Sequence, residues 1–566
     1  TMTSSPSTIK ISVSSSSTPP NNNDTATTAT NSLSQTDLKP IKKSDTPSLD
    51  KTPEVSDNRD DHRTKGVARI KKEFIIERTK APDSLKRTAE NARLGNAGKS
   101  KKHKKQKKGQ NKDRSKTNKL GVEKDSENYD PNNENEMNHI RGELKYALSK
   151  KKYDFTKAKE VEQHVTKFIE RRNKQKANKN SFTLSYLQPA SDTNRSTYVE
   201  TKYKPEEIKK VDFENKLIVA PLTTVGNLPF RRICKEFGAD ITVSEMAVVS
   251  NILRGSQQEL ALLKRHKSED VFGIQVAGGN AFHMTQFAQF AAENLECSFV
   301  DINVGCPIDV ICNKGMGTGL MAKKSRFEGI VRGMKEMLNV PLSVKIRTGL
   351  VDKKLLAHQL VPKIVDWGAD AITLHGRTKQ QRYTKESDWN YISQCADVAN
   401  SVPFIGNGDV MSYTEYSDHM QNHNVQAVMI GRGALIKPWV LTEIKEQRHW
   451  DISATERFDM LKKFTSYGMD HYGADEYGVE LTRRFLLEWL SFLHRYIPVG
   501  LLERGIPQHI NERPPPYKGR NELETLMASE DVNDWIEITK RLIPQQLPEG
   551  FTFLPKHRSN SYQVEG

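Results

Sequence analysis

The stretch from residue 217 to residue 435 alternates short apolar runs with helix-length segments, and this alternation restricts the possible folds more than any other feature. Eight runs begin 24–42 residues apart and have the apolar or β-branched composition of buried strands. They are LIVAPL (217–222), ITVSEM (241–246), VFGIQVAG (271–278), FVDINVG (299–305), PLSVKIRTG (341–349), AITLHGR (371–377), PFIGNGD (403–409) and AVMIGRGAL (427–435). Eight strands that alternate with helices predict an α/β fold of the (β/α)8, or TIM, barrel class.

A doubly wound open sheet is the structural alternative. Such a sheet usually has fewer strands, and its glycine fingerprint follows the first strand. Here the first run leads into APLTTVGNLPF, which does not contain the G-x-G-x-x-G pattern. The barrel is therefore the better interpretation.

The sequence on either side of the predicted barrel has a different composition. Residues 1–136 are rich in Ser, Thr, Asn, Asp and Lys and contain neither Trp nor Cys, so we expect a disordered tail. Residues 137–203 are charged and compatible with one or two lead-in helices, before a barrel domain at 204–451. Amphipathic segments in 452–548 predict a separate helical domain, and 549–566 form a short C-terminal tail.

The chain is basic, with 87 Lys and Arg against 71 Asp and Glu and a pI near 9.3. This balance favours a polyanionic partner. The tail contains KSKKHKKQKKGQNKDRSK (99–116), which is either a solvated charge run or a nucleic-acid contact or nuclear address. The alternatives are about equally supported.

Several features bear on the compartment of the protein. Five cysteines in 566 residues do not suggest a disulfide framework, so we expect a reducing compartment. No apolar run reaches membrane-spanning length, so no membrane partner is expected. The start of the sequence lacks an apolar signal core, and its first arginine is Arg59. These observations indicate the cytoplasm, the nucleus or both.

Polar residues collect at the C-terminal ends of the predicted strands, where barrel enzymes place their active sites. The glycine-containing ends of strands seven and eight resemble barrel loops that bind phosphate through backbone N–H groups. We therefore favour a phosphate-bearing cofactor, although each residue alone has an ordinary structural alternative. The polar positions, in strand order, are Gln275, Asn303, Ser343, Lys345, Arg347, Thr373, His375, Arg377, Asn407, Gly408, Asp409, Gly431 and Arg432.

Seven motifs in this region resemble, in their order, those of the tRNA-dihydrouridine synthases. They are APLT, GIQVAG, DINVGCP, VKIRTG, LHGRT, GNGD and IGRGAL. The C-terminal stretches RRFLLEWLSFLHRYIPVGLLER and INERPPPY resemble a eukaryotic branch of that family, so the likeness covers about residues 204–562. Members of this branch usually carry Cys/His zinc fingers before the barrel. All cysteines here lie from Cys234 to Cys395, so this sequence offers no such finger, and no metal is expected.

The resemblance implies a flavoenzyme that binds FMN, takes electrons from NADPH or NADH, and reduces a tRNA uridine, in this branch one in the variable loop. It leaves mRNA open as an additional substrate. Gln275 would bind the polar edge of the flavin, and Lys345 would lie near the atoms where negative charge collects on reduction. The cofactor-binding residues that the resemblance implies are Pro221, Leu222, Thr223, Gln275, Lys345, His375, Asn407, Gly408, Asp409, Gly431 and Arg432.

The resemblance implies Cys306 as the catalytic acid. Reduction of the uracil C5=C6 bond requires a hydride at C6 from reduced flavin and a proton at C5. A thiol with an ordinary pKa of about 8.5 is mostly protonated at neutral pH and can supply that proton. The alternative is that Cys306 is a buried thiol at a strand end. Cys312 is interpreted as structural.

The expected substrate contacts lie in two places. Asn303 would orient the uracil, with Arg347 and Arg377 beside it at the barrel mouth. In the helical domain the candidate RNA contacts are Arg483, Arg484 and Arg495, unless they are ordinary surface charges. Two other functions remain as alternatives: an FMN barrel oxidoreductase that acts on a free pyrimidine, and a catalytically silent RNA-binding protein.

Overall fold

The computed structural model describes residues 69–76, 135–177, 209–383, 385–400, 402–503 and 515–556. The basic run at 99–116 lies outside the described residues, and so do 178–208 and 557–566. Within the described residues, no helix combines the length and the apolar composition that crossing a membrane would require.

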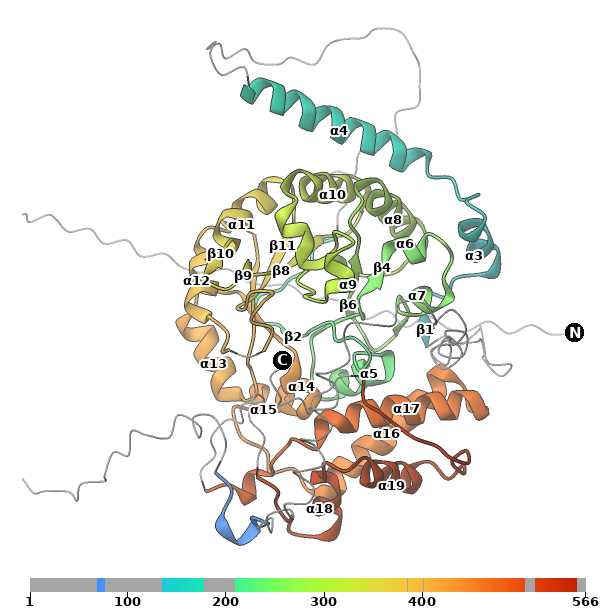
Figure 1. Ribbon diagram of the computed structural model, residues 1–566, viewed down its shortest axis with the longest axis vertical. Helices are drawn as coiled ribbons and strands as arrows, with labels where there is room; N and C mark the ends of the chain where they lie inside the picture. Colours follow the sequence, from blue (N-terminus) through green and yellow to red (C-terminus); the bar gives the residue numbers. More distant parts are fainter. Residues whose placement is uncertain are drawn as a thin grey trace, which may run out of the picture. The chain divides into compact units, whose positions relative to one another are not determined.

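Eight parallel strands close into a barrel, as the sequence predicted (Figure 1). The circle is completed because β2 pairs with both β13 and β3, and β3 pairs in turn with β6. Each predicted run contributes one strand, and a closed sheet excludes the doubly wound alternative. The strands are β2 (Leu217–Val219), β3 (Ile241–Val243), β6 (Val271–Ala277), β7 (Phe299–Val304), β8 (Leu342–Arg347), β11 (Ala371–His375), β12 (Phe404–Asn407) and β13 (Ala427–Ile430).

Helices surround the strands on the outside of the barrel (Figure 1). The capping of these helices follows from the sequence: Asn280 caps α8, and Ser412 and Glu415 form a capping box at α13. The outer helices are α5 (Leu228–Glu236), α8 (Ala281–Asn294), α10 (Lys324–Met337), α11 (Ala357–Asp366), α12 (Trp389–Asp397), α13 (Tyr413–Asn422) and α15 (Val440–Glu446).

Two layers of residues fill the barrel interior. Phe299, Ala371 and Ile405 belong to a compact apolar cluster inside the lower part of the barrel. Their strand neighbours two and four residues later point the same way, because side chains alternate along a strand. The upper layer is polar, so the apolar cluster closes the bottom and leaves the C-terminal strand ends for chemistry.

A helical domain follows the barrel, as expected, and its described helices are α16 (Ala454–Tyr472), α17 (Glu476–Leu493), α18 (Glu522–Ala528) and α19 (Val532–Leu542). Trp489 of α17 fastens this domain to the barrel. Its ring lies edge-on to Phe230 of α5, with ring centroids 5.3 Å apart. Its indole N–H donates to the carbonyl oxygen of Leu435 at 3.0 Å.

The expectation of disorder up to residue 136 is wrong for residues 69–76. Ile70 is only 4% exposed and forms an antiparallel bridge with Leu502, and Ile75 forms another with Tyr517. This short segment, which includes the 3-10 helix η1 (Lys72–Phe74), therefore belongs to the helical domain. It has no regular pattern of its own, because its apolar side chains gain their partners only from residues more than 400 positions later.

The lead-in region is helical where it is described. It begins with β1 (Glu136–Met137), which pairs with β5 (Arg265–His266), and continues into α3 (Gly142–Ser149) and α4 (Thr156–Ala177). Helix α4 packs against α8 and α10 on the outside of the barrel (Figure 1).

Candidate active site

The strand register gathers the predicted polar residues at one level of the barrel mouth. Asn303 pairs with Lys345 between β7 and β8, and His375 pairs with Arg347 and with Asn407 on either side. In β8 and β11 these polar positions alternate with Val344, Ile346, Ile372 and Leu374, which are buried in the core between strands and helices. The alternation predicted from sequence is therefore confirmed for these strands.

A chain of hydrogen bonds links the buried carboxylate of Asp301 to the backbone of Cys306. The amide nitrogen of Gln275 donates to Asp301 at 2.8 Å, and the amide nitrogen of Asn303 donates to the oxygen of Gln275 at 2.8 Å. The oxygen of Asn303 accepts from the backbone N–H groups of Gly305 and Cys306 at 3.2 and 2.8 Å. Because Asp301 accepts but cannot donate when ionised, it fixes the orientation of both amides.

Lys345 lies beside this chain and is half-buried in the same polar layer. Its ammonium donates to the side-chain oxygen of Asn407 at 2.8 Å, and Asn407 in turn donates to the carbonyl oxygen of Met429 at 2.7 Å. Burial lowers the pKa of Lys345 to about 8, although the negative charge of Asp301 acts to raise it. Burial likewise raises the pKa of Asp301 to about 6, although the positive charge of Lys345 acts to lower it.

The loop that carries Cys306 is held from both sides. The guanidinium of Arg347 donates to the carbonyl oxygens of Gly305 and Thr378 at 2.9 and 2.8 Å. The carbonyl oxygen of Cys306 accepts from the N–H of Thr318 at 3.0 Å. Burial raises the pKa of the Cys306 thiol, so the thiol is protonated at neutral pH. The geometry therefore suits a proton donor better than a nucleophilic thiolate.

Cys312 lies behind Cys306 in the same loop. Its sulfur is 3.4 Å from the carbonyl oxygen of Cys306 and 3.1 Å from the hydroxyl of Thr318. These contacts agree with the structural role expected for Cys312.

A carboxylate at the end of β12 joins two guanidinium groups. Asp409 accepts from Arg377 at 2.5 Å and from Arg432 at 2.7 Å, and it also accepts from the backbone N–H of Ser387 at 2.8 Å. Burial alone would raise the pKa of Asp409, but the two guanidinium groups lower it below its ordinary value. Asp409 therefore remains ionised and fixes both arginines.

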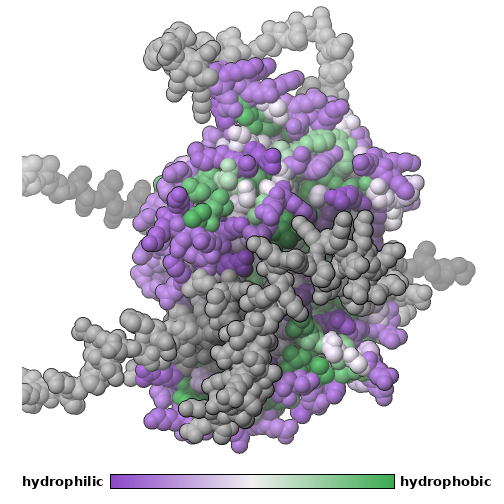
Figure 2. All heavy atoms as spheres, in the orientation of Figure 1, coloured by the Kyte–Doolittle hydropathy of each residue, from purple (hydrophilic) through white to green (hydrophobic). Residues whose placement is uncertain are grey.

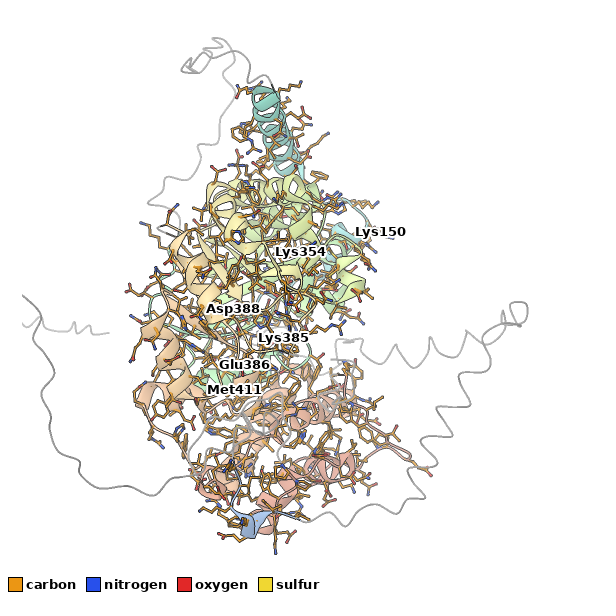
Figure 3. The ribbon with its side chains drawn as sticks, turned by 60° about the vertical axis from the view of Figure 1, so that its left-hand side comes forward. Lys150, Lys354, Lys385, Glu386, Asp388 and Met411 are labelled. Atoms are coloured by element: carbon orange, nitrogen blue, oxygen red, sulfur yellow. The ribbon has the colours of Figure 1, made fainter. Side chains whose placement is uncertain are left out.

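The turn after β12 requires a glycine. Gly408 has φ +142°, and a Cβ added there would lie 2.1 Å from the hydroxyl oxygen of Ser387. Figure 3 labels Lys385, Glu386 and Asp388 in the segment after β11, close to Met411 after β12. The two segments are in contact, because the backbone N–H of Ser387 donates to Asp409 at 2.8 Å, and spacing along the chain does not reveal this contact.

His375 is buried among the cations of the mouth. Burial lowers its pKa well below the ordinary value, and the charges of Arg347, Lys345, Arg377 and Arg432 lower it further. The imidazole is therefore neutral and can both donate and accept a hydrogen bond.

Tyr383 is a member of the mouth that the sequence analysis missed. It is 48% exposed, and the guanidinium of Arg432 lies 4.1 Å from its ring centroid. Arg347 and Arg377 lie 6.0 and 5.9 Å from the same ring. The residues around Tyr383 form no motif that would predict its position beside these arginines. Asp301 was also missed, although its inward position follows from that of Asn303, two residues later in the same strand.

The remaining cofactor candidates lie at the ends of β2 and β13. Pro221 and Leu222 are half-buried and Thr223 is exposed in the turn after β2. A Cβ added at Gly431 would meet nothing nearer than Ala220 at 3.7 Å and Leu222 at 3.9 Å. A methyl group would therefore fit at Gly431, the residue that precedes α14 (Arg432–Ile436), in ordinary van der Waals contact.

The arginines predicted to bind substrate differ in accessibility. Arg347 and Arg377 are buried, and their hydrogen bonds hold the loops of the mouth together. Arg483 is 1% exposed and donates to the carbonyl oxygen of Gln545, so it would have to leave this bond to reach RNA. Arg484 is partly exposed and pairs with Glu480. Their roles in RNA binding stay predictions.

Arg495 differs from Arg483 and Arg484 because its charge acts on Arg432, a residue of the mouth. Arg495 is buried. Burial of Arg432, together with the charges of Arg377 and Arg495, lowers the pKa of Arg432 to about 10, whereas Tyr383 and Asp409 act to raise it. The helical domain thus contributes positive potential to the end of β13.

A separate cluster of possible metal ligands lies on α13. The ligand atoms of Asp418, His419 and His423 lie within 4.8 Å of one another. The ring of His419 also stacks on Trp389, with centroids 3.7 Å apart. This stacking accounts for the position of the imidazole without an ion.

The charges of the mouth do not balance. The carboxylates of Asp301, which is buried, and Asp409, which is half-buried, face four cations, so this group of side chains has a net positive charge that suits an anionic ligand. The carboxylates are Asp301 and Asp409, and the cations are Lys345, Arg347, Arg377 and Arg432.

The sequence of the barrel region matches a known protein family and several known proteins. The family model described as dihydrouridine synthase (Dus) matches residues 218–490. A Xenopus tropicalis protein named as an NAD(P)(+) tRNA-dihydrouridine(47) synthase-like protein is 58% identical over 362 residues, which cover 64% of this chain and 56% of that protein. Proteins of the same name from Homo sapiens and Oryza sativa subsp. japonica are 56% and 50% identical over 362 and 380 residues, which cover 64% and 66% of this chain and 55% of each relative. The chain thus spans about half the length of these curated relatives.

Proposed function

Residues 218–490 belong to the dihydrouridine synthase family, and from this premise we propose that the protein reduces a uridine of tRNA to 5,6-dihydrouridine. FMN would be the bound cofactor and NADPH or NADH the reductant. The names of the relatives refer to position 47, which supports a uridine in the variable loop. The observation that carries the proposal is the hydrogen-bonded chain from Asp301 to the backbone of Cys306, at the mouth of a cationic barrel.

The residues at the mouth fit FMN. Arg432 and the first backbone N–H groups of α14 offer donors to a phosphate. Lys345 and Gln275 offer donors lower in the barrel, where the polar edge of a flavin would lie. The excess of cations favours both the phosphate and the negative charge of a reduced flavin. When bound, FMN supplies the hydride for C6 of the uracil.

Cys306 would supply the proton that completes the reduction. The thiol holds this proton on Sγ, and burial keeps it there at neutral pH. Asn303 and Arg347 fix the backbone around Cys306, so the thiol is positioned before the substrate arrives. Transfer of the proton to C5 leaves a thiolate, which the charge of Arg347 stabilises. Neutral His375 provides a further hydrogen-bonding group without adding charge.

The uridine must leave its stack to reach this mouth, as bases do in other base-modifying enzymes. The helical domain would bind the surrounding tRNA. Its Arg484 is accessible, and the charge of Arg495 extends the positive potential of the mouth toward that domain. We propose the cytoplasm or the nucleus as the place where the protein meets its tRNA.

Mass spectrometry of tRNA from cells with and without the protein tests the proposal directly. We expect one dihydrouridine in the variable loop to disappear without the protein, and to return when wild-type protein is supplied. The purified protein should be yellow and release FMN on denaturation. Unchanged tRNA in the deficient cells would contradict the proposal. Turnover of a free pyrimidine by the same protein would favour the alternative oxidoreductase.

A further inference from the structure

Helices α3 and α4 lie before the family region and carry a surface that the proposed reaction does not use. Helix α4 is held firmly on the barrel. Arg172 forms an ion pair with Glu328 of α10, and the backbone N–H of Ala158 donates to Gln289 of α8 at 3.0 Å. His164 lies 3.4 Å from Glu336 of α10. The position of α4 is therefore set by contacts on the side that faces the barrel.

The other side of α3 and α4 is strongly basic. Between residues 141 and 175, nine exposed side chains are basic and four are acidic. In Figure 2 the edge of the molecule where Figure 1 shows α4 is mostly hydrophilic. The basic residues are Arg141, Lys150, Lys151, Lys152, Lys157, Lys159, Lys167, Arg171 and Lys174, and the acidic ones are Glu143, Asp154, Glu160 and Glu170.

Three of these cations form a row. Lys167, Arg171 and Lys174 are spaced i, i+4 and i+7, so they lie on one face of α4. No carboxylate in the described part of the chain forms an ion pair with any of them, whereas Arg172 and His164 face the carboxylates of α10. The carboxylates of α10 thus pair with Arg172 and His164 of α4, whereas the positive charges of this row remain accessible to a binding partner.

An aromatic group accompanies the cations at the start of the surface. Tyr146 of α3 is 54% exposed, and the ammonium groups of Lys150 and Lys152 lie 5.9 and 5.7 Å from its ring centroid. Figure 3 shows Lys150 at the outer edge of the described chain. Cations around an exposed aromatic ring suit a partner that combines phosphates with flat bases.

We propose that α3 and α4 form a second RNA-binding surface, which grips phosphates of the tRNA away from the reacting uridine. This inference rests on the proposed function, because that function makes RNA the substrate. A membrane is the poorer partner, since a basic helix on a bilayer needs a free apolar face and the apolar face of α4 lies against α8 and α10. A row of cations on a fixed helix matches the regular charge of an RNA backbone.

The test is a salt titration of tRNA binding with the full chain. The variant Lys167→Ala/Arg171→Ala/Lys174→Ala removes the row and keeps residues that favour a helix. We expect weaker binding and a slope of log K against log salt that is shallower by about 0.7–0.9 for each lost phosphate contact, or ~2–3 in total. Dihydrouridine formation at saturating tRNA should remain, because these residues lie outside the mouth.

Two controls make the result specific. The variant Lys167→Arg/Lys174→Arg keeps the charges and should bind like the wild type, and Lys363→Ala removes an exposed cation from α11 and should leave the slope unchanged. An unchanged slope in the triple alanine variant would overturn the inference, and so would equal losses in the arginine variant. Displacement of tRNA by polyglutamate at equal charge concentration would also overturn it, in favour of an acidic protein partner. If the wild type binds tRNA but forms no dihydrouridine, the proposed function fails instead.

Discussion

The side-chain oxygen of Asn303 accepts the backbone N–H of Cys306 at 2.8 Å, while its amide nitrogen donates to Gln275 at 2.8 Å. One amide therefore links the proposed proton donor to the buried carboxylate of Asp301, which holds the other end of Gln275. The position of Cys306 thus depends on the ionisation of a group on the same strand. The predictions below follow from this link and from the charges around it.

Cys306→Ala should retain FMN and its reduction by NADPH but should lose reoxidation by tRNA. We expect the rate of reoxidation to fall by about 10²–10⁴, which is typical for the loss of a general acid. In the wild type the same rate should also fall at alkaline pH, as Cys306 loses its proton. Rapid-reaction absorbance of the flavin measures both effects. Wild-type reoxidation in the variant would show that another group donates the proton.

Asp301→Asn should shift the pH dependence of FMN binding to lower pH. The pKa of Lys345 is about 8, and the negative charge of Asp301 opposes a further decrease. Without that charge, Lys345 should become neutral at a lower pH, so FMN should dissociate at a lower pH. Flavin fluorescence between about pH 6 and 10 gives the midpoint. Lys345→Arg should abolish the transition in this range, because arginine stays charged. A midpoint that is unchanged or higher in Asp301→Asn would contradict the coupling.

Asp409→Asn should destabilise the fold and weaken FMN binding together. Asparagine at this position takes the shared anionic partner away from the guanidinium groups of Arg377, which is buried, and Arg432, which is half-buried, and such a loss costs about 3–5 kcal/mol. Because the folded pKa of Asp409 is lowered, its contribution is present above about pH 4 and is lost as the pH falls through the folded pKa. Urea denaturation at pH 7 measures the free energy of unfolding.

The matched control for Asp409→Asn is Lys379→Ala. It breaks the exposed ion pair between Lys379 and Asp309, which should change the free energy of unfolding by only about 0–1 kcal/mol. Equal effects of the two variants would show that the Asp409 cluster contributes no more than a surface pair.

Gly408→Ala should destabilise the turn after β12, and Ser387→Gly should restore part of the loss. The new methyl group would collide with the side chain of Ser387, and alanine also rarely adopts φ +142°. Ser387→Gly removes the collision but not the backbone strain, which costs about 1–3 kcal/mol. Thermal unfolding of both single variants and the double variant separates the two contributions. Full recovery in the double variant would show that the backbone is unstrained.

His375→Gln should flatten the dependence of stability on pH below about 6.5. The folded pKa of His375 is far below its ordinary value of about 6.5, so the unfolded chain binds a proton there and the folded protein does not. The free energy of unfolding therefore falls as the pH drops below this value, by up to about 1.4 kcal/mol per pH unit for such a group. The pKa values of His139 and His419 are lowered too, so part of the slope should remain. Identical slopes in the wild type and the variant would contradict the burial of a neutral imidazole.

The barrel was predictable because its strands are buried on both faces and therefore appear in the sequence as continuous apolar runs. The polar residues that interrupt these runs point into the barrel and indicate the position of the mouth. His375 and Lys345 were found in this way. Tyr383 and Ser387 were not, because they lie in the connection after β11 and come to the mouth through tertiary contacts. The packing of residues 69–76 against the helical domain was not predicted for the same reason, because the bridges to Leu502 and Tyr517 produce no periodic pattern in the sequence.

The attachment of Trp489 to Phe230 and Leu435 has a consequence for modularity. The helical domain is a separate stretch of sequence, yet one of its largest side chains completes the apolar surface of the barrel. A barrel cut after residue 451 would expose that socket to water and would be prone to aggregate. A chimaera that takes its helical domain from a relative should fold only when the contacting residues of α5 and α14 come from the same relative. The barrel and the helical domain therefore depend on each other for burial of this apolar surface, although they are separate stretches of sequence.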